Sequence, residues 1–245
     1  MPRCRLIDDG PRSGVWNMAA DEYLLQSATG SNNCVLRLYQ WSEPTLSLGY
    51  FQRHGDRQFH AGSRSCPLVR RSSGGGAIVH DQELTYCFVT PVQDRWFADH
   101  SELYTQFHQS IMDTLSELGV TDLQSADGSS GINSAFLCFQ RNAVGDILIG
   151  TEKVVGSAQR RSKNALLQHG SILWRQSPKA NELPGIADLS STTSVLADFI
   201  KSWPKRLATQ LVLDFHEEST SNQENGSIEA LITNQFGDSK WSKRR

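Results

Sequence analysis

The spacing of apolar residues predicts two amphipathic helices in the first half of the chain. Ser13 fits an N-cap, and apolar side chains then recur at helical spacing through residues 14–28. Residues 101–119 repeat this spacing, and their Ser-Glu start and final Gly119 agree with the usual signals for the two ends of a helix. One side of this second helix is apolar: Leu103, Phe107, Ile111, Leu115 and Leu118.

Short apolar runs between glycine, proline and polar residues predict β-strands. In residues 83–91, Leu84, Tyr86 and Phe88 occupy every second position, as in a strand with two different faces. Residues 146–161 predict two strands joined by a tight Gly-Thr-Glu turn. The other predicted strands lie at residues 4–9, 34–41, 45–51, 77–81 and 165–174, and residues 67–71 lead into a run of glycines.

The order of these elements predicts an α+β fold. Many short strands stand in hairpin order with helices before, between and after them, which favours a mixed sheet over a doubly wound parallel one. Two more helices are predicted near residues 193–211 and 226–235. Between them, "HEESTSNQENGS" predicts a polar exposed turn or a short disordered segment. We expect one domain over residues 1–245, with a helical extension from about residue 190.

Charge and hydropathy narrow the classes of partner. The chain of 245 residues carries a net charge of −2, which argues against general polyanion binding, so no nucleic-acid partner is expected. No apolar run approaches the ~18 residues of a membrane helix, so no membrane partner is expected either. The opening "MPRCRLIDDG" lacks the apolar core of a signal peptide, which predicts a cytoplasmic location.

The chain has five cysteines: Cys4, Cys34, Cys66, Cys87 and Cys138. Their wide spacing, without a CxxC pair, indicates neither a zinc site nor a disulfide framework. One of them could be a nucleophile, although a free cysteine is more often a small buried hydrophobe. Cys138 follows a polar, glycine-rich loop predicted at residues 125–134, but its apolar surroundings do not separate it from Cys87.

The stretch "RRSSGGGAIVHD" at residues 70–81 contains three consecutive glycines. A Walker A loop would place Lys-Ser/Thr where Ala77 and Ile78 stand, and a Rossmann fingerprint opens a helix where a strand is predicted here. Residues without a Cβ let a ligand lie against backbone N–H groups, and Arg70 and Arg71 add positive charge beside them. The alternative is a passive hairpin turn, which the entropic cost of three glycines disfavours.

Lys153 and His169 are further candidates. Lys153 stands in a predicted strand just before Gly156 and Ser157, where an ammonium can bind phosphate or depress the pKa of a neighbouring thiol. On this segment alone, a solvated lysine at a sheet edge is the better interpretation. His169 precedes Gly170, and a lone histidine is usually a structural residue.

Five ordered stretches resemble one known family, the lipoate–protein ligases and octanoyltransferases, whose catalytic domain is shared with biotin ligases. The stretches are "SGVWNMAADEYLL", "PTLSLGYFQ", "RRSSGGGAIVHD", "DILIGTEKVVGSAQRR" and "LLQHGSIL". The closing "LITNQFGDSKWSKRR" also resembles the end of family members, so the similarity covers nearly the whole chain.

This resemblance implies a largely antiparallel mixed sheet flanked by helices, related to class II synthetase catalytic domains. It also implies transfer of a lipoyl or octanoyl group to one lysine of a carrier domain. The family's ligases form an acyl-adenylate from ATP. Its cysteine-dependent octanoyltransferases hold octanoate from acyl carrier protein as a thioester.

Two features resemble the transferases: "QELTY" after His80-Asp81, and the position of Cys138 upstream of Lys153. Gly76 instead resembles the ligases, and Leu137 stands where a smaller residue or proline is expected. We therefore expect an octanoyltransferase that needs neither cofactor nor metal. Its partners would be octanoyl-acyl carrier protein and a lipoyl carrier domain of the glycine cleavage H protein or 2-oxoacid dehydrogenase E2 type. The alternatives are a ligase that uses ATP and Mg, and a non-catalytic module that binds acylated carrier domains.

The resemblance also assigns roles to residues. Cys138 would be the nucleophile, and Lys153 would supply the positive charge that favours its thiolate. Backbone donors near Gly156 or in the glycine run could stabilise the oxyanion. The residues implied to bind the substrate are Arg70, Ser73, Gly74, Gly75, Gly76, His80, Gly156, Ser157, Ala158, His169 and Gly170.

Overall fold

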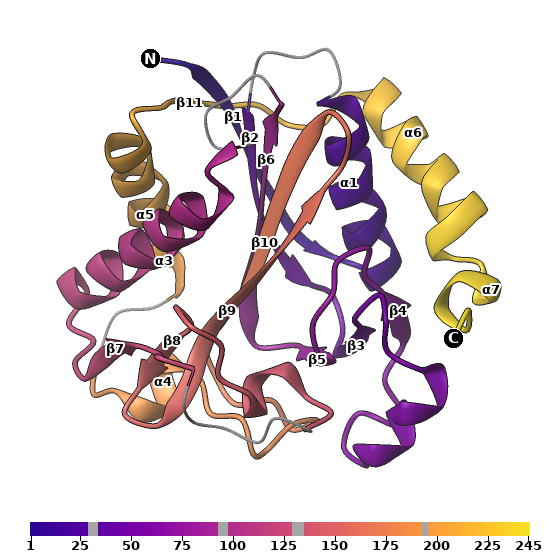
Figure 1. Ribbon diagram of the computed structural model, residues 1–245, viewed down its shortest axis with the longest axis horizontal. Coiled ribbons are helices and arrows are strands. Elements are labelled where there is room, and N and C mark those ends of the chain that lie inside the picture. Colours follow the sequence, from indigo (N-terminus) through magenta and orange to yellow (C-terminus); the bar gives the residue numbers. More distant parts are fainter. Residues whose placement is uncertain (29–33, 93–97, 129–134, 193–195) are drawn as a thin grey trace.

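A central eight-stranded sheet organises the protein, as the computed structural model shows for residues 1–28, 34–92, 98–128, 135–192 and 196–245 (Figure 1). The strand order is β11-β1-β2-β6-β10-β9-β8-β7. β1 runs parallel to β2 and β11, and the other neighbouring pairs are antiparallel, which confirms the predicted fold class. The strands are β1 (Arg3–Arg12), β2 (Cys34–Trp41), β6 (Glu83–Pro91), β7 (Leu123–Ser125), β8 (Ile147–Ile149), β9 (Glu152–Arg161), β10 (Ala165–Leu173) and β11 (Asp214–Glu217).

A second sheet of three short strands carries the glycine run. Its order is β4 (Leu68–Arg70), β3 (Thr45–Leu48), β5 (Ile78–His80). β3 ends at Leu48, three residues before the predicted end, because the chain turns at Gly49. A Cβ on Gly49 would lie 2.0 Å from the Gly75 carbonyl oxygen, so this turn packs directly on the glycine run.

Helices cover both faces of the large sheet (Figure 1). α3 (His100–Glu117) and α5 (Leu196–Leu211) pack on one face, whereas α1 (Gly14–Ser27) and α6 (Asn222–Leu231) cover the other. The shorter helical elements are η1 (His54–Phe59), η2 (Cys138–Gln140), α4 (Ile186–Leu189), the π-helical turn η3 (Ile232–Phe236) and α7 (Ser239–Ser242). In the described part of the chain, no helix combines the length and apolarity needed to cross a bilayer.

Alternate side chains of β6 pack into the two hydrophobic clusters on opposite faces of the sheet, which confirms the predicted alternation along this strand. Leu84, Tyr86 and Phe88 belong to the cluster under α3 and α5, whereas Cys87 and Val89 belong to the cluster under α1. All nine residues of the strand are buried, because helices cover both of its faces. Burial on both sides fixes the register of β6, which matters because β6 forms one wall of the site described below.

The predicted ends of α1 and α3 are nearly correct. The Ser13 hydroxyl accepts a hydrogen bond from the Trp16 N–H, as an N-cap does. α3 begins one residue earlier than predicted, because Asp99 caps it by accepting from the Glu102 N–H at 3.3 Å. Gly119 follows with a φ of +84°, the left-handed conformation that stops a helix at little cost to glycine.

The prediction for residues 216–227 is wrong. This segment completes β11 and forms the first turns of α6, four residues before the predicted start. Ser221 and Glu224 make a capping box, with Ser221 N–H to Glu224 at 2.7 Å, and Glu224 also pairs with Arg5 at 2.6 Å. The polar composition concealed this cap, although the Ser-x-x-Glu spacing is its usual sequence signal.

Candidate active site

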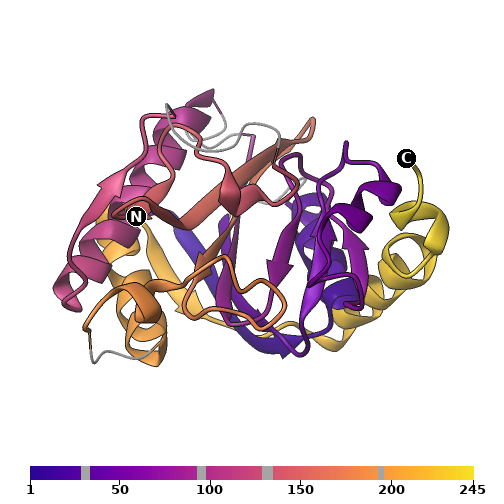
Figure 2. The same cartoon turned by 90° about the horizontal axis from the view of Figure 1, so that it is seen from below.

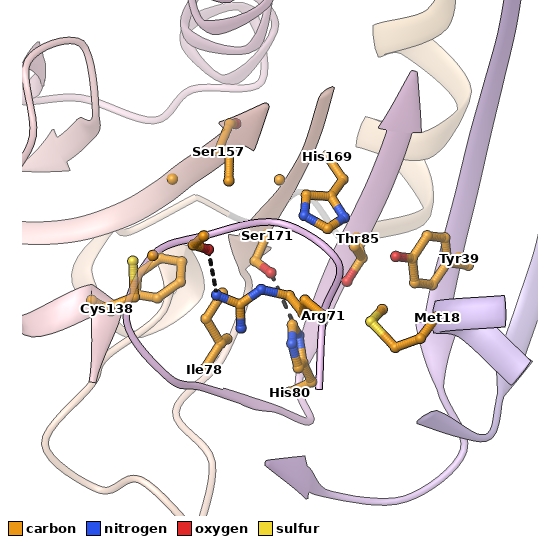
Figure 3. Close-up of a pocket in the computed structure, with 16 residues that line it drawn as sticks. Met18, Tyr39, Arg71, Ile78, His80, Thr85, Cys138, Ser157, His169 and Ser171 are labelled. Carbon is orange, nitrogen blue, oxygen red and sulfur yellow. Dashed lines mark hydrogen bonds between the residues drawn. The ribbon is translucent and has the colours of Figure 1, made fainter. Parts of the chain in front are cut away.

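A pocket lies between the glycine run and strands β6, β9 and β10. Cys138 stands at one end of the labelled residues, and Met18 and Tyr39 stand at the other (Figure 3). Nine of the predicted site residues lie on its wall: Gly74, Gly75, His80, Cys138, Gly156, Ser157, Ala158, His169 and Gly170. Strands far apart in the sequence therefore bring most of the predicted site together.

Cys138 and Lys153 meet at one end of the pocket. Lys153 on β9 points its Nζ at the Cys138 Sγ from 3.9 Å, and Cys138 starts the short helix η2. The same ammonium contacts the Asp146 carboxylate at 2.6 Å and the Arg141 carbonyl at 3.2 Å. Lys153 is only 6% exposed, so the interpretation as a solvated edge lysine is wrong. Its three donors have three partners, and one of them is the thiol.

Gly156 leaves room for this lysine. A Cβ at position 156 would lie 2.5 Å from the Lys153 Cε and 2.9 Å from its Nζ. A side chain there would push the ammonium away from Cys138. Gly170 on β10 is equally constrained, since its Cβ would lie 2.3 Å from the Ser157 Oγ. Both glycines therefore serve close packing at the pocket wall.

Gly76 holds the backbone of the cysteine. It is not on the pocket wall, but a Cβ there would lie 3.0 Å from both Cα and N of Cys138. The Cys138 N–H donates to the Ala77 carbonyl at 2.7 Å, and Ala77 bridges Leu137 in parallel. Gly75, with φ of +94°, makes the turn that brings this segment in. The glycine run thus positions Cys138 as well as exposing its own backbone.

Arg70 was predicted to bind substrate, but it does not lie at the pocket. Its side chain is buried and does not line the pocket. β4 ends at Arg70, and the guanidinium points toward the turn after β3 and the last residue of α7. Its hydrogen bonds go to four backbone carbonyls: Gly49, Tyr50, Gln52 and Ser242. These contacts give Arg70 a structural role, and the predicted contact with substrate needs correction.

Arg71 lines the pocket in its place. Neighbouring residues of an extended chain point to opposite sides, so Arg71 faces the cavity that Arg70 turns away from. Its guanidinium donates to the Gly74 and Gly76 carbonyls at 3.1 and 2.8 Å and to the Ser47 hydroxyl at 2.7 Å. Arg71 therefore holds the glycine run in its curved shape and presents positive charge to the pocket.

His80 belongs to a buried polar network behind the pocket. Its Nδ1 lies 2.6 Å from the Glu83 carboxylate and its Nε2 2.7 Å from the Ser47 hydroxyl. The Trp41 ring stacks on the imidazole with centroids 3.9 Å apart. Burial lowers the pKa of His80, although Glu83 opposes that shift. The ring therefore supports the wall and links β5 to β6.

His169 anchors a second network on the other side. Its Nε2 lies 2.6 Å from the Ser73 hydroxyl and its Nδ1 3.2 Å from Asp21 of α1. Asp21 also accepts from Arg37 at 2.9 Å and from the Tyr39 hydroxyl at 2.9 Å. Ser73, predicted to bind substrate, stands behind His169 rather than on the wall of the pocket that Cys138 lines. This network ties the glycine run to α1 and β2.

Ser157 is held by a directed chain of hydrogen bonds. Burial lowers the pKa of His108 to about 4, so its imidazole is neutral at neutral pH. His108 Nδ1 donates to the Gly145 carbonyl at 2.5 Å, which leaves Nε2 to accept from the Ser157 hydroxyl at 2.7 Å. Ser157 accepts in turn from the Tyr86 hydroxyl at 2.7 Å, and Tyr86 accepts from the Gln168 amide. The hydroxyl at the pocket wall therefore has a fixed direction.

Six wall residues escaped sequence reasoning: Met18, Tyr39, Ile78, Thr85, Phe139 and Ser171. Strand periodicity could have found Ser171, which stands two residues after His169 and so shares its face. Asp146 was also missed, and its contact with Lys153 arises only when β8 and β9 pair. No local pattern marks such a contact.

Residues 13–210 match the lipoyl protein ligase A/B catalytic domain. Octanoyltransferase LipM of Carboxydothermus hydrogenoformans is 37% identical over 180 residues, which are 71% of this chain and 65% of that relative. The LipM of Brevibacillus brevis is 28% identical over the full length of both chains. A bipartite lipoate protein ligase of Thermoplasma acidophilum has a similar fold, with a TM-score of 0.75 and 20% identity over 99% of this chain and 96% of that one. The chain belongs to the family of lipoyl protein ligase A/B catalytic domains.

Proposed function

We propose that the protein is an octanoyltransferase that carries the acyl group on Cys138. It takes octanoate from octanoyl-acyl carrier protein and passes it to a lysine of a lipoyl carrier domain. The observation that carries this proposal is the Lys153 ammonium 3.9 Å from the Cys138 sulfur at the end of a pocket. The octanoyltransferases among the relatives support it.

The first step is thioester exchange. The Cys138 thiolate, beside the Lys153 ammonium, attacks the carbonyl carbon of the donor thioester, and the C=O electron pair moves to oxygen. Collapse of the tetrahedral intermediate expels the donor thiolate, which takes a proton from the site or solvent. The Cys138 N–H is already bonded to the Ala77 carbonyl, so backbone donors of Gly74–Gly75 are the better candidates for the oxyanion.

The second step releases the cysteine. A neutral lysine amine of the carrier domain attacks the acyl-Cys138 carbonyl, the amine loses its extra proton to solvent, and Cys138 leaves as a thiolate. Lys153 stabilises that leaving group as it stabilised the nucleophile. The pocket would bury the alkyl chain beside Met18, Ile78 and Phe139, where each methylene contributes ~0.8 kcal/mol.

The runner-up is an ATP-dependent ligase, which the fold of the Thermoplasma acidophilum enzyme favours. An adenylate needs cations for its phosphate, and sequence reasoning offered Arg70 and Lys153. The Arg71 guanidinium faces the pocket, but it donates to the Gly74 and Gly76 carbonyls and to the Ser47 hydroxyl. The Arg70 guanidinium is bound to backbone carbonyls, and the Lys153 ammonium is paired with Asp146 and directed at Cys138. These contacts favour thioester chemistry, which requires neither ATP nor Mg.

The type of carrier domain is inferred from the partner of a ligase with a similar fold. The Thermoplasma acidophilum ligase has an E2 lipoyl domain as its partner. We expect the acceptor here to be a lipoyl domain of that type or a glycine cleavage H protein, in the cytoplasm.

Mass spectrometry of the protein after incubation with octanoyl-acyl carrier protein tests the proposal. We expect one octanoyl adduct on Cys138, discharged by an apo lipoyl domain without ATP, and none in Cys138→Ala. Pyrophosphate exchange that depends on ATP and octanoate, with activity retained in Cys138→Ala, would assign the ligase reaction instead. Binding of the acylated carrier without turnover would identify a non-catalytic module.

A further inference from the structure

One exposed surface combines many cations with two exposed aromatic rings. It is made by residues 50–64 and 240–245, which lie side by side at the end of the molecule that holds β3, β4 and α7 (Figures 1 and 2). Phe51 and Phe59 are 68% and 69% exposed. The cations of this surface, here called the basic face, are Arg53, Arg57, Arg64, Lys240, Lys243, Arg244 and Arg245. Within these two segments Asp56 is the one acidic side chain.

Direct contacts hold the two segments together. The His54 N–H donates to the Arg245 carbonyl at 2.8 Å, and the Arg244 guanidinium donates to the Tyr50 hydroxyl at 2.7 Å. The Arg245 guanidinium lies 5.2 Å from the Phe51 ring centroid. Burial, Arg57 and Lys243 lower the pKa of His54, which agrees with cations from both segments gathering there. A chain whose net charge is −2 therefore concentrates positive charge on one face.

The basic face adjoins the active site. The Tyr50 N–H donates to the Ser73 carbonyl at 2.8 Å, and the exposed Phe51 ring lies 3.9 Å from the Cβ position of Gly74. The Gln52 amide donates to the Phe136 carbonyl at 3.3 Å, two residues before Cys138. The same short stretch thus contacts the glycine run and the cysteine segment. A partner bound on this face would have the pocket within reach.

Arginine and aromatic side chains are enriched in protein interfaces, and complementary charge accelerates encounter. We propose that the basic face docks the acidic surface of the acyl carrier protein that donates octanoate, with Phe51 as its apolar contact. This inference rests on the proposed function. The chemistry demanded of the partner is a negatively charged domain that brings a thioester to Cys138.

The test compares two double charge reversals that change the net charge equally. Arg53→Glu with Lys243→Glu alters the basic face. Lys201→Glu with Lys205→Glu alters exposed lysines of α5, on the other side of the sheet (Figure 1). For each protein we measure the second-order rate of Cys138 acylation at low salt, by octanoyl-acyl carrier protein and by the neutral thioester octanoyl-N-acetylcysteamine. Circular dichroism and thermal melts verify folding.

We expect the basic-face variant to react about 10-fold or more slowly with the acyl carrier protein, and at the wild-type rate with the small thioester. Salt should slow the wild type and leave this variant nearly unchanged. The α5 variant should behave as the wild type.

Equal rates for the two variants would overturn the docking proposal while leaving the proposed function intact. So would a loss confined to transfer onto the lipoyl domain, which would assign the face to the acceptor. If wild-type Cys138 is acylated by neither donor, the proposed function itself fails.

Discussion

Cys87 and Cys138 have the same functional group and opposite surroundings. Cys87 is fully buried in β6, opposite His169 in the sheet, where burial and the Asp21 carboxylate raise the pKa of its thiol well above the usual range. Cys138 lies on the pocket wall with the Lys153 ammonium 3.9 Å away. Access and the sign of the neighbouring charge therefore separate Cys87 from Cys138, the proposed nucleophile.

Replacing each cysteine by alanine should give the largest difference in octanoyl transfer between the two sites. We expect Cys138→Ala to lower octanoyl transfer by on the order of 10³-fold or more, since the acyl carrier is lost. Cys87→Ala should keep activity within about 2-fold and cost ~1 kcal/mol of stability through a small cavity. Rates on an apo lipoyl domain and urea unfolding measure both effects. Comparable activity losses in the two variants would contradict the assignment.

Local sequence patterns predicted most of the fold but left these two cysteines equivalent, and the choice of Cys138 rested on the family resemblance alone. Periodicity located β6, β10, α1 and α3, because the period of buried positions is a local property. The choice of nucleophile depends on what lies opposite the sulfur after folding. Asp146 reaches Lys153 only through the β8–β9 hairpin, so neither its identity nor its spacing marked it.

The two arginines before the glycine run also show that the sequence does not mark contacts that depend on how strands pack. Arg70 and Arg71 have identical chemistry, and sequence reasoning assigned the substrate contact to Arg70. Consecutive residues of an extended chain point to opposite sides, and which side faces the pocket is set by how β4 packs on β3. The family resemblance pointed to this segment, which lies at the pocket, whereas the geometry of the sheet determines which of the two arginines lines it.

Acidification should lower the free energy of unfolding because His108 is buried and neutral in the folded protein. Below pH 6.5 an unfolded chain protonates His108, whereas the folded protein does not until about pH 4, so the unfolded state binds more protons. The stability due to this group is therefore lost as the pH falls, by about 2 kcal/mol between pH 7 and 5.

In His108→Asn, an amide can still donate to the Gly145 carbonyl but does not titrate. Urea unfolding of wild type and variant at pH 7 and 5 measures the difference. His80, whose pKa is also lowered, contributes equally to both proteins and cancels in the comparison. Identical losses of stability on acidification would show that His108 does not carry this pH dependence.

The smallest effect tests the placement of the ammonium rather than its presence. In Gly156→Ala, the new methyl would lie 2.5 Å from the Lys153 Cε, so the lysine must shift away from Cys138 while the sheet stays intact. We expect Cys138 to be acylated about 10-fold more slowly, since small misplacements of a catalytic group are costly.

Gly226→Ala is the matched control, because a Cβ on this exposed residue of α6 meets no atom within 4 Å. That variant should keep its rate and gain about 0.5–1 kcal/mol of stability, as alanine favours a helix interior over glycine. Stopped-flow acylation and thermal melts of both variants separate the effects. If Gly156→Ala reacted at the wild-type rate, proximity of the ammonium would not be what distinguishes Cys138 from Cys87. Access alone would then account for the difference.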